Sequence, residues 1–310
     1  MTTVRDVGRF GYRRFGVNPT GVMDPIAARI ANVLVGNSDH DAVIEANFPA
    51  PEIRFQSDTI FAVTGGDFAP RLDGAEIRNW RTFRAEAGST LTFSSKVAGS
   101  RCYIAVAGGF AITQWLGSST TNLAAAAGGY HGRKLAAGDV IEIGEPGVFP
   151  SVGVSPAPSI LPRYHDFPTV RITVGPEFDR LSTASGNDLL NSTFTIGKNS
   201  DLMGFRLEGP SLTVDGETAF LSSAVTLGTI QLPPGGDPIL LMSDHQTTGG
   251  YPRIGHVAAV DIPLAAQLGP SDRIAFHLVE PEEAHKLLIA MERDLVMLRT
   301  ACRLRSTKRI

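Results

Sequence analysis

A short polar segment late in the sequence carries the side chains with the greatest capacity for chemistry. It reads DHQTTGGYP from Asp244 to Pro252 and begins two residues after an apolar run that ends at Met242. The Asp244 carboxylate can accept and orient a proton donor, and the His245 imidazole can transfer a proton near neutral pH. We therefore predict that Asp244 and His245 are catalytic residues.

The remaining residues of this segment have the chemistry of a binding site. Gln246 offers both a hydrogen-bond donor and an acceptor, which suits a small amide, lactam or ureido substrate. The glycine pair lets the backbone turn sharply and approach a ligand closely. A structural turn with solvated side chains is the alternative, but this density of polar residues at a strand end favours function. The predicted substrate-binding residues here are Gln246, Thr247, Thr248, Gly249, Gly250 and Tyr251.

Two other segments contain candidate binding residues. Asn18 and Asp24 lie in NPTGVMD, just before a predicted helix, where free N–H groups and the helix dipole favour anions. The alternative for this segment is a plain capping turn. Arg206, in DLMGFR, can clamp a carboxylate or phosphate, although its spacing alone favours an exposed arginine on an edge strand. We predict that Asn18, Asp24 and Arg206 line the same site.

The sequence lacks the standard catalytic motifs, including GxSxG, GxGxxG, HExxH and the GxxxxGK phosphate loop. Its seven histidines are scattered, and no pair has ligand spacing with a carboxylate nearby. We therefore expect no metal in this chain.

The elements that position these residues read as β-strands. With 33 glycines and 20 prolines, turns bound many short apolar runs and leave little room for crossover helices. This pattern predicts a mostly-β barrel or sandwich rather than a doubly wound α/β fold. The predicted strands are Thr59–Thr64, Thr90–Phe93, Cys102–Ala107, Val140–Ile143, Val170–Val174, Ile239–Met242 and Ile274–Val279.

Two helices stand out from this pattern. The first starts with Asp24 as its cap and Pro25 at its first position, and Gly36 ends it. The second starts at Pro281 and lies on the surface, because apolar and charged residues occupy opposite faces. Its predicted apolar face is Leu287, Leu288, Met291, Leu295 and Leu298. Its predicted solvent face is Glu282, Glu283, Lys286, Glu292 and Arg293.

Proline density predicts the domain boundary. Six prolines fall within residues 146–168, which is typical of a semi-rigid linker. We predict a β-barrel domain at residues 1–145, this linker, and a second β-barrel domain with a terminal helix at residues 169–310.

The whole-chain composition excludes several classes of protein. A net charge of −3 offers no general attraction to nucleic acid or anionic membranes. No run approaches the ~20 apolar residues of a membrane helix, and the start lacks the apolar core of a signal peptide. Two cysteines without CxxC spacing suit a reducing compartment. We therefore expect a cytoplasmic protein.

Ordered blocks along nearly the whole chain resemble one family, the allophanate hydrolase subunit 2 family, which is also called KipA-like and includes the C subunit of 5-oxoprolinase. They are similar as well to one half of the carboxyltransferase region of urea carboxylase. The blocks are TTVRDVGRFGYR (2–13), NPTGVMDPIAARIANVLVGN (18–37), YIAVAGGF (103–110), LGSSTTN (116–122), GGYHGRKLAAGD (128–139), MGFRLEGP (203–210), GTIQLPPGGDPILL (228–241) and DHQTTGGYP (244–252).

This resemblance implies two cyclophilin-like β-barrel domains with a few short helices. It also implies a partner, the subunit 1 or KipI-like chain, with a composite site. The main hypothesis is a subunit of an ATP-dependent enzyme that opens a lactam such as 5-oxoproline with a third, lactam-utilisation subunit, so that ATP acts at the level of the complex. One alternative is carboxyl transfer from carboxybiotin to urea beside a biotin carboxylase. The other is a KipA-like protein that sequesters a KipI-like kinase inhibitor.

Three departures from the family pattern bear on these hypotheses. The family usually has an apolar strand before its TTV-Q-D block, whereas this sequence begins at that block. At the position of Arg5 the family has glutamine. At the position of Leu202 the family has arginine, and an aliphatic side chain cannot replace that charged hydrogen-bond donor.

Overall fold

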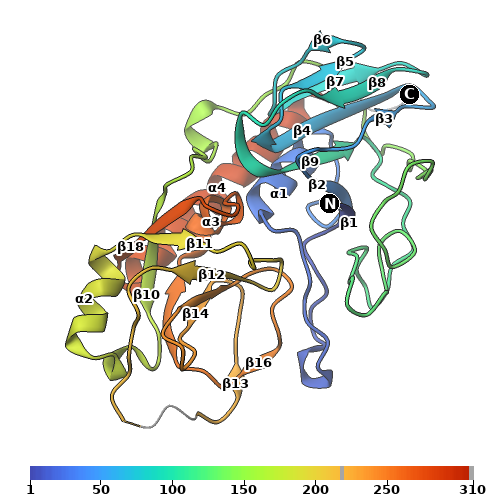
Figure 1. Cartoon of the computed structure of the whole chain (residues 1–310). Coiled ribbons are helices and arrows are strands. Elements are labelled where there is room, and N and C mark those ends of the chain that lie inside the picture. Colours follow the sequence, from blue (N-terminus) through green and yellow to red (C-terminus); the bar gives the residue numbers. More distant parts are fainter. Residues whose placement is uncertain (217–219, 307–310) are drawn as a thin grey trace. The chain divides into compact units, whose positions relative to one another are not determined.

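The computed structural model describes residues 1–216 and 220–306, and contacts divide the chain into two compact units (Figure 1). Unit 1 contains residues 1–9, 20–162 and those from Met291 onward. Unit 2 contains residues 10–19 and 163–290. The main boundary between the two units falls between residues 162 and 163, within the predicted linker. Residues 10–19 belong to unit 2 and the end of the last helix to unit 1, which differs from the predicted ranges. The predicted domain boundaries stay a prediction.

Unit 1 has a central antiparallel sheet with the order β1-β2-β9-β4-β7. Its strands are β1 Thr2–Arg5, β2 Val43–Asn47, β9 Ala98–Val106, β4 Thr59–Asp67 and β7 Arg81–Ala85. A second sheet has the order β3-β8-β5-β6, with strands β3 Ile53–Arg54, β8 Thr90–Phe93, β5 Pro70–Leu72 and β6 Ala75–Glu76. The described part of unit 1 therefore forms two sheets.

Both faces of the central sheet are covered, which explains the continuous apolar run in β9. Tyr103 and Ala105 face a core formed with α1 Pro25–Leu34 and the later part of α4 Pro281–Arg305. Ile104 and Val106 face the opposite core, which the second sheet covers. A strand buried on both faces reads as an unbroken apolar segment, because neither set of alternate residues meets water.

The start of α1 follows the local signals in its sequence. The Asp24 Oδ1 atom accepts a hydrogen bond from the Ala27 backbone N–H at 2.9 Å, and Pro25 occupies the first turn. Gly36 has a φ of +77° directly after the helix, a conformation that glycine adopts without strain. The predicted helix boundaries are therefore confirmed.

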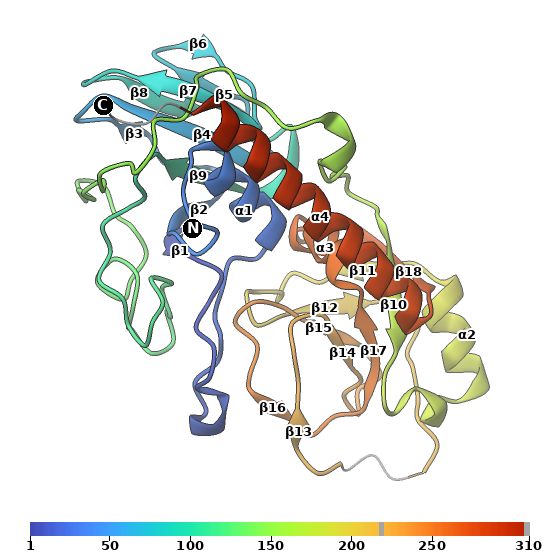
Figure 2. The same ribbon diagram turned by 180° about the vertical axis from the view of Figure 1, so that it is seen from behind.

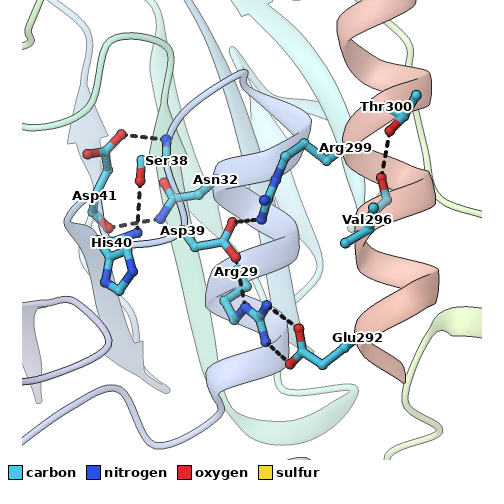
Figure 3. Close-up of polar contacts among 10 residues, drawn as sticks. All are labelled: Arg29, Asn32, Ser38, Asp39, His40, Asp41, Glu292, Val296, Arg299 and Thr300. Atoms are coloured by element: carbon cyan, nitrogen blue, oxygen red, sulfur yellow. Dashed lines mark hydrogen bonds and ion pairs between the residues drawn. The ribbon is translucent and has the colours of Figure 1, made fainter. Parts of the chain in front are cut away.

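The later part of α4 packs beside α1 in unit 1 (Figure 2), and an ion-pair ladder joins the two helices (Figure 3). The Arg29 guanidinium donates to both Glu292 carboxylate oxygens, at 2.6 and 2.7 Å, and to Asp39 at 3.1 Å. Arg299 donates to the other Asp39 oxygen. Glu292 was predicted on the solvent face, and its side chain is 42% exposed, but its carboxylate also binds the half-buried Arg29 of the other helix.

Unit 2 contains a closed barrel whose strand order is β10-β17-β14-β15-β12-β11-β18 in the described residues. Neighbouring strands are antiparallel except where β10 and β18 close the ring in parallel. The barrel strands are β10 Thr169–Val174, β11 Phe194–Ile196, β12 Gly204–Glu208, β14 Thr229–Gln231, β15 Ile239–Leu241, β17 Arg253–Val257 and β18 Arg273–Leu278.

Smaller elements surround this barrel. A two-stranded ribbon pairs β13 Ser223–Ala224 with β16 Thr248–Gly249. The helix α2 Thr183–Asn191 packs beside β18 (Figure 1), and α3 Ile262–Ala266 precedes that strand. Single 3₁₀ turns cover Arg13–Phe15, Pro158–Ile160, Phe178–Arg180 and Ala259–Asp261. The predicted mostly-β fold is confirmed, although α4, at 25 residues, is a long helix.

The predicted strand Val140–Ile143 does not form. Only one isolated bridge, between Phe110 and Ile143, joins this segment to a neighbour, and Val140 is 55% exposed. Residues 111–114, which follow Phe110 and would continue the pairing, form no strand, so the pairing stops after this one bridge. The segment instead borders an open cavity of about 450 Å³ with an apolar floor that includes Ile104.

The proline-rich segment 146–168 lacks regular strands, as predicted, but it is not a free linker along its length. Val154 is buried, and its N–H donates to Thr82 Oγ1 at 2.9 Å. The Thr82 N–H donates in turn to the Val154 carbonyl at 3.0 Å. Part of the segment therefore packs along β7 of unit 1.

Candidate functional site

The DHQTTGGYP segment leaves the end of barrel strand β15 and enters the ribbon strand β16. Ser243 and Asp244 form a turn, and Thr248–Gly249 then pair with Ser223–Ala224 of β13. His245 is buried, Gln246 and Thr247 are half-buried, and Tyr251 is 44% exposed. The segment thus runs from the barrel core to the surface of unit 2.

Backbone hydrogen bonds from two other segments hold Asp244 in place. Its N–H donates to the Leu202 carbonyl at 2.8 Å, and its own carbonyl accepts from Asn18 Nδ2 at 2.9 Å. Its Oδ1 atom lies 3.4 Å from the Ser243 hydroxyl. The structure therefore brings two predicted residues, Asn18 and Asp244, together. It also places Leu202, where the family has arginine, directly beside this turn.

The imidazole of His245 has a defined tautomer. Its Nδ1 atom lies 2.6 Å from the Gln246 backbone carbonyl, which can only accept, so Nδ1 carries the proton. Burial lowers the pKa of His245, with a smaller lowering from the Arg13 charge. The neutral ring then has Nε2 as its basic nitrogen. This arrangement suits a general base near neutral pH.

A buried glutamine from the neighbouring strand β14 supports the segment from below. Gln231 Oε1 accepts from Gln246 Nε2 at 3.1 Å, and Gln231 Nε2 lies 3.4 Å from the Tyr251 carbonyl. Gly249 passes so close that a Cβ there would lie 2.4 Å from Gln231 Nε2. A Cβ at 249 would therefore displace the Gln231 amide, so glycine lets the two groups pack closely here, in addition to any role toward a ligand.

The other predicted residues of the segment lie on its outer part. The Thr247 carbonyl accepts from the Val225 N–H at 3.3 Å, and Thr248 is exposed on β16. A Cβ on Gly250 would lie 3.2 Å from the Phe220 carbonyl, so the main chains approach closely there. These contacts fix the backbone and leave the threonine side chains at the surface of the ribbon.

Asp24 and Arg206 occupy different surroundings. Asp24 belongs to unit 1, is fully buried, and accepts from the Ala27 N–H at the start of α1. Arg206 is exposed on β12 opposite Ile239, five residues before Asp244 along β15. At about 3.3 Å per residue, that separation is roughly 16 Å. The structure therefore does not bring the Arg206 backbone to the Asp244 turn.

Sequence reasoning missed Gln231, Thr229 and Arg13. Thr229 and Gln231 are both buried on β14, and Thr229 Oγ1 lies 3.5 Å from His256 Nδ1. Arg13 donates to the Val225 carbonyl at 3.0 Å, next to the ribbon. The sequence did contain a signal for β14. Thr229 and Gln231 are two polar residues at strand spacing among apolar residues, and this pattern indicates that one face of the strand is polar.

The structure also describes the positions that bear on cofactors and membranes. Among the described residues, no group of three or more histidine, cysteine, aspartate or glutamate side chains could hold a metal ion. Both cysteines, Cys102 and Cys302, are buried thiols. Arg5, where the family has glutamine, is buried and donates to Gly21 O at 3.1 Å and Thr3 Oγ1 at 3.2 Å. In residues 1–216 and 220–306, every helix is too short or too polar to span a membrane.

The chain thus combines a mostly-β fold with a polar turn that follows strand β15 of a closed barrel. The family described as carboxyltransferase domain, subdomain A and B, matches residues 15–278, and the chain belongs to this family. The C subunit of the 5-oxoprolinase of Haemophilus influenzae is 36% identical over 286 residues, which is 92% of this chain and 90% of that protein.

Two solved structures are similar to nearly the whole chain. The urea amidolyase of K. lactis superimposes with a TM-score of 0.89 at 27% identity, over 96% of this chain and 19% of that one. The urea carboxylase of Kluyveromyces lactis gives a TM-score of 0.88 at 28% identity, over 96% and 28%. This chain therefore spans less than a third of either solved chain.

Proposed function

We propose that the chain is one subunit of a heteromeric, ATP-dependent hydrolase that acts on the C–N bond of a small amide or lactam, of the 5-oxoprolinase type. The end-to-end match to the C subunit of a 5-oxoprolinase carries this proposal, because it covers about nine tenths of both chains. The partner would be a subunit 1 or KipI-like chain, and ATP would act at the level of the complex.

The geometry of the turn supports roles for individual residues. Neutral His245, with its Nδ1–H bonded to a carbonyl, would accept a proton at Nε2. Asp244 would orient the substrate or the attacking group, and its backbone is held on both sides. Gln246 and the adjacent threonines would bind the amide. Asn18 acts through the Asp244 carbonyl in this proposal, and Asp24 stays a candidate only as a scaffold residue.

A second candidate function is carboxyl transfer to a ureido substrate. The family match and the two Kluyveromyces structures favour it. The turn offers both hydrogen-bond donors and acceptors, which fits a ureido group. The Gln246 side-chain amide by itself carries one group of each kind. Carboxybiotin, when bound, would supply the carboxyl group, and this chain would contribute Gln246 and Asp244 to holding the ring beside the acceptor.

The decisive experiment purifies the chain with a subunit 1-like partner and a lactam-utilisation subunit, and measures ATP-dependent loss of 5-oxoproline. A parallel mixture with a biotin carboxylase and biotin carrier measures bicarbonate-dependent carboxylation of urea. We expect turnover in the first mixture and its loss in Asp244→Asn. The matched control is Asp179→Asn, an exposed aspartate of unit 2, which should behave as wild type.

Three outcomes separate the proposals. Turnover only in the second mixture would replace lactam opening by carboxyl transfer. Full activity of Asp244→Asn in the active mixture would remove Asp244 from catalysis. Stable binding of the partner without turnover in either mixture would overturn the enzyme proposals and leave the KipA-like binding protein.

A further inference from the structure

Two side-chain amides lie end to end beneath the polar turn. Gln231, on β14, is 1% exposed, and Gln246 is half-buried above it. Their contact joins Gln246 Nε2 to Gln231 Oε1 at 3.1 Å. The far end of Gln231 faces the backbone carbonyl of Tyr251 at 3.4 Å. The pair therefore forms a short chain of hydrogen-bonding groups that starts at a main-chain carbonyl.

The starting point fixes the polarity of this chain. A backbone carbonyl can only accept a hydrogen bond, so the end of Gln231 that faces Tyr251 must be the NH₂ group. Gln231 Oε1 then faces Gln246, and this oxygen requires a donor opposite it, which is Gln246 Nε2. Turning either amide over would place two oxygen atoms or two NH₂ groups against each other inside the protein, where an unmade bond is costly.

Steric contacts keep Gln231 in this position. It is buried on a barrel strand, and the Gly249 backbone passes so close that a Cβ would lie 2.4 Å from its Nε2 atom. The polarity of Gln246 is therefore set by the fold. This contact uses one of the two N–H groups of Gln246 Nε2, and Gln246 Oε1 accepts no hydrogen bond from the residues that the structure describes.

We propose that Gln231 is a positioning residue that presents Gln246 to the substrate as a hydrogen-bond acceptor, so that the site selects substrates carrying an N–H. This inference rests on the proposed function and narrows its substrate class. Lactams, primary or secondary amides and ureido groups with a free N–H satisfy Gln246 Oε1. N-alkylated amides and esters of the same shape leave that oxygen without a donor, and such a mismatch is strongly rejected by sites built around a buried polar group.

A binding experiment tests the inference without turnover. The purified complex is titrated with 2-pyrrolidinone and with N-methyl-2-pyrrolidinone, and the dissociation constants are compared by NMR line shifts. In the wild type we expect 2-pyrrolidinone to bind at least about tenfold more tightly, from the loss of one hydrogen bond to a partly buried oxygen. An equal affinity for the two probes would overturn the inference.

Two substitutions of Gln231 separate positioning from a general structural role. Gln231→Leu removes the acceptor that orients Gln246, so the preference for the N–H probe should fall below about threefold as the amide turns over freely. Gln231→Glu keeps an oxygen opposite Gln246 Nε2 in either protonation state, so the preference should return. An unchanged preference in Gln231→Leu, or its loss in both variants while thermal unfolding matches the wild type, would contradict the proposal.

Turnover then distinguishes this inference from the proposed function. If the complex discriminates the two probes but opens no lactam, the proposed function fails and the role of Gln231 stands. If it opens 5-oxoproline, Gln231→Leu should raise KM more than it lowers kcat, since the residue acts through binding. Equal turnover of 5-oxoproline and its N-methyl derivative by wild type would overturn the inference while the proposed function remains.

Discussion

In unit 1 the charged side chains of Arg29, Asp39 and Glu292 bind one another, whereas in unit 2 the Asp244 N–H and carbonyl each form a hydrogen bond with another segment (Figure 3 shows the unit 1 ladder). Each group in the ladder has an opposite charge within hydrogen-bond reach. At the turn, a carbonyl and an amide anchor the chain, and a histidine ring retains a basic nitrogen.

By this difference the ladder of unit 1 belongs to the scaffold, whereas the turn of unit 2 is the candidate site. Side chains that satisfy one another stabilise the fold and have little left to offer a ligand. In a segment held partly through its main chain, those main-chain hydrogen bonds do not depend on which side chains the segment carries. The comparison predicts that substitutions in the ladder change stability, whereas substitutions in the turn change activity.

The largest effect should come from His245→Gln. Removing the base from the turn should lower kcat with 5-oxoproline by about 100- to 1,000-fold, the usual range for a general base. Burial lowers the pKa of His245, so wild-type kcat/KM should stay high as the pH falls to 6.5 and decline only below it. Steady-state kinetics of the complex between pH 5 and 8 would check both points. A His245→Gln enzyme with an unaltered pH profile would break the comparison.

The next effect should come from the ladder. Arg29→Met leaves Glu292 and one oxygen of Asp39 without their partner, and should lower the free energy of unfolding by about 2 kcal/mol. The value is below that of a fully buried pair, since the Glu292 side chain is 42% exposed. Urea unfolding of the chain measures it.

A double-mutant cycle sharpens this result. Combining Arg29→Met with Glu292→Gln should give a coupling free energy of about 1 kcal/mol. The kcat of the complex should change by less than about twofold in these variants. Additive effects on unfolding would mean that the ion pair contributes no net stability.

A smaller effect is expected at the start of α1. Asp24→Ala removes the side chain that accepts from the Ala27 N–H, and should cost about 1 kcal/mol of unfolding free energy. Asp24→Asn keeps a capping oxygen and should recover most of that stability. Thermal or urea unfolding of both variants would decide. If both lost the same stability, the charge rather than the cap would be the source of stabilisation.

The smallest effect concerns pH and stability. Burial lowers the pKa of both His245 and His256 below 6.5, so the unfolded chain binds more protons as the pH falls through that value. The two histidines therefore contribute stability that is present above pH 6.5 and lost as the pH falls through their lowered folded values. Urea unfolding at pH 7.5 and 5.5 should show a smaller decrease for His256→Gln than for wild type. An equal decrease would contradict this account.

Local signals were sufficient for several elements. The cap and proline before α1 predict its start because both act within one turn of the helix. The apolar runs of β4 and β9 predict strands because most of each run is buried, and β10 is predicted because its alternate residues Val170 and Ile172 are buried. Val140–Ile143 is also apolar, yet it lacks a ladder because the residues after Phe110, which would pair with it, form no strand.

Features that depend on long-range contacts could not be predicted from local sequence patterns. The ion pair of Glu292 with Arg29 spans 263 residues, so helical periodicity predicts a solvent-facing glutamate. The polar turn could be predicted because its chemistry is concentrated in nine consecutive residues. Gln231 could not be assigned a role in advance, because its partners lie 15 and 20 residues away in the segment that follows β15.

The contact between the Asp244 N–H and the Leu202 carbonyl has a consequence for how this site can diverge. Every residue type except proline supplies that N–H, and every residue type supplies that carbonyl. This main-chain hydrogen bond therefore does not depend on the side chains at 202 and 244, although the buried Leu202 side chain also packs against its neighbours. A single substitution at this turn can therefore change its chemistry while the main-chain hydrogen bond that holds the turn is kept.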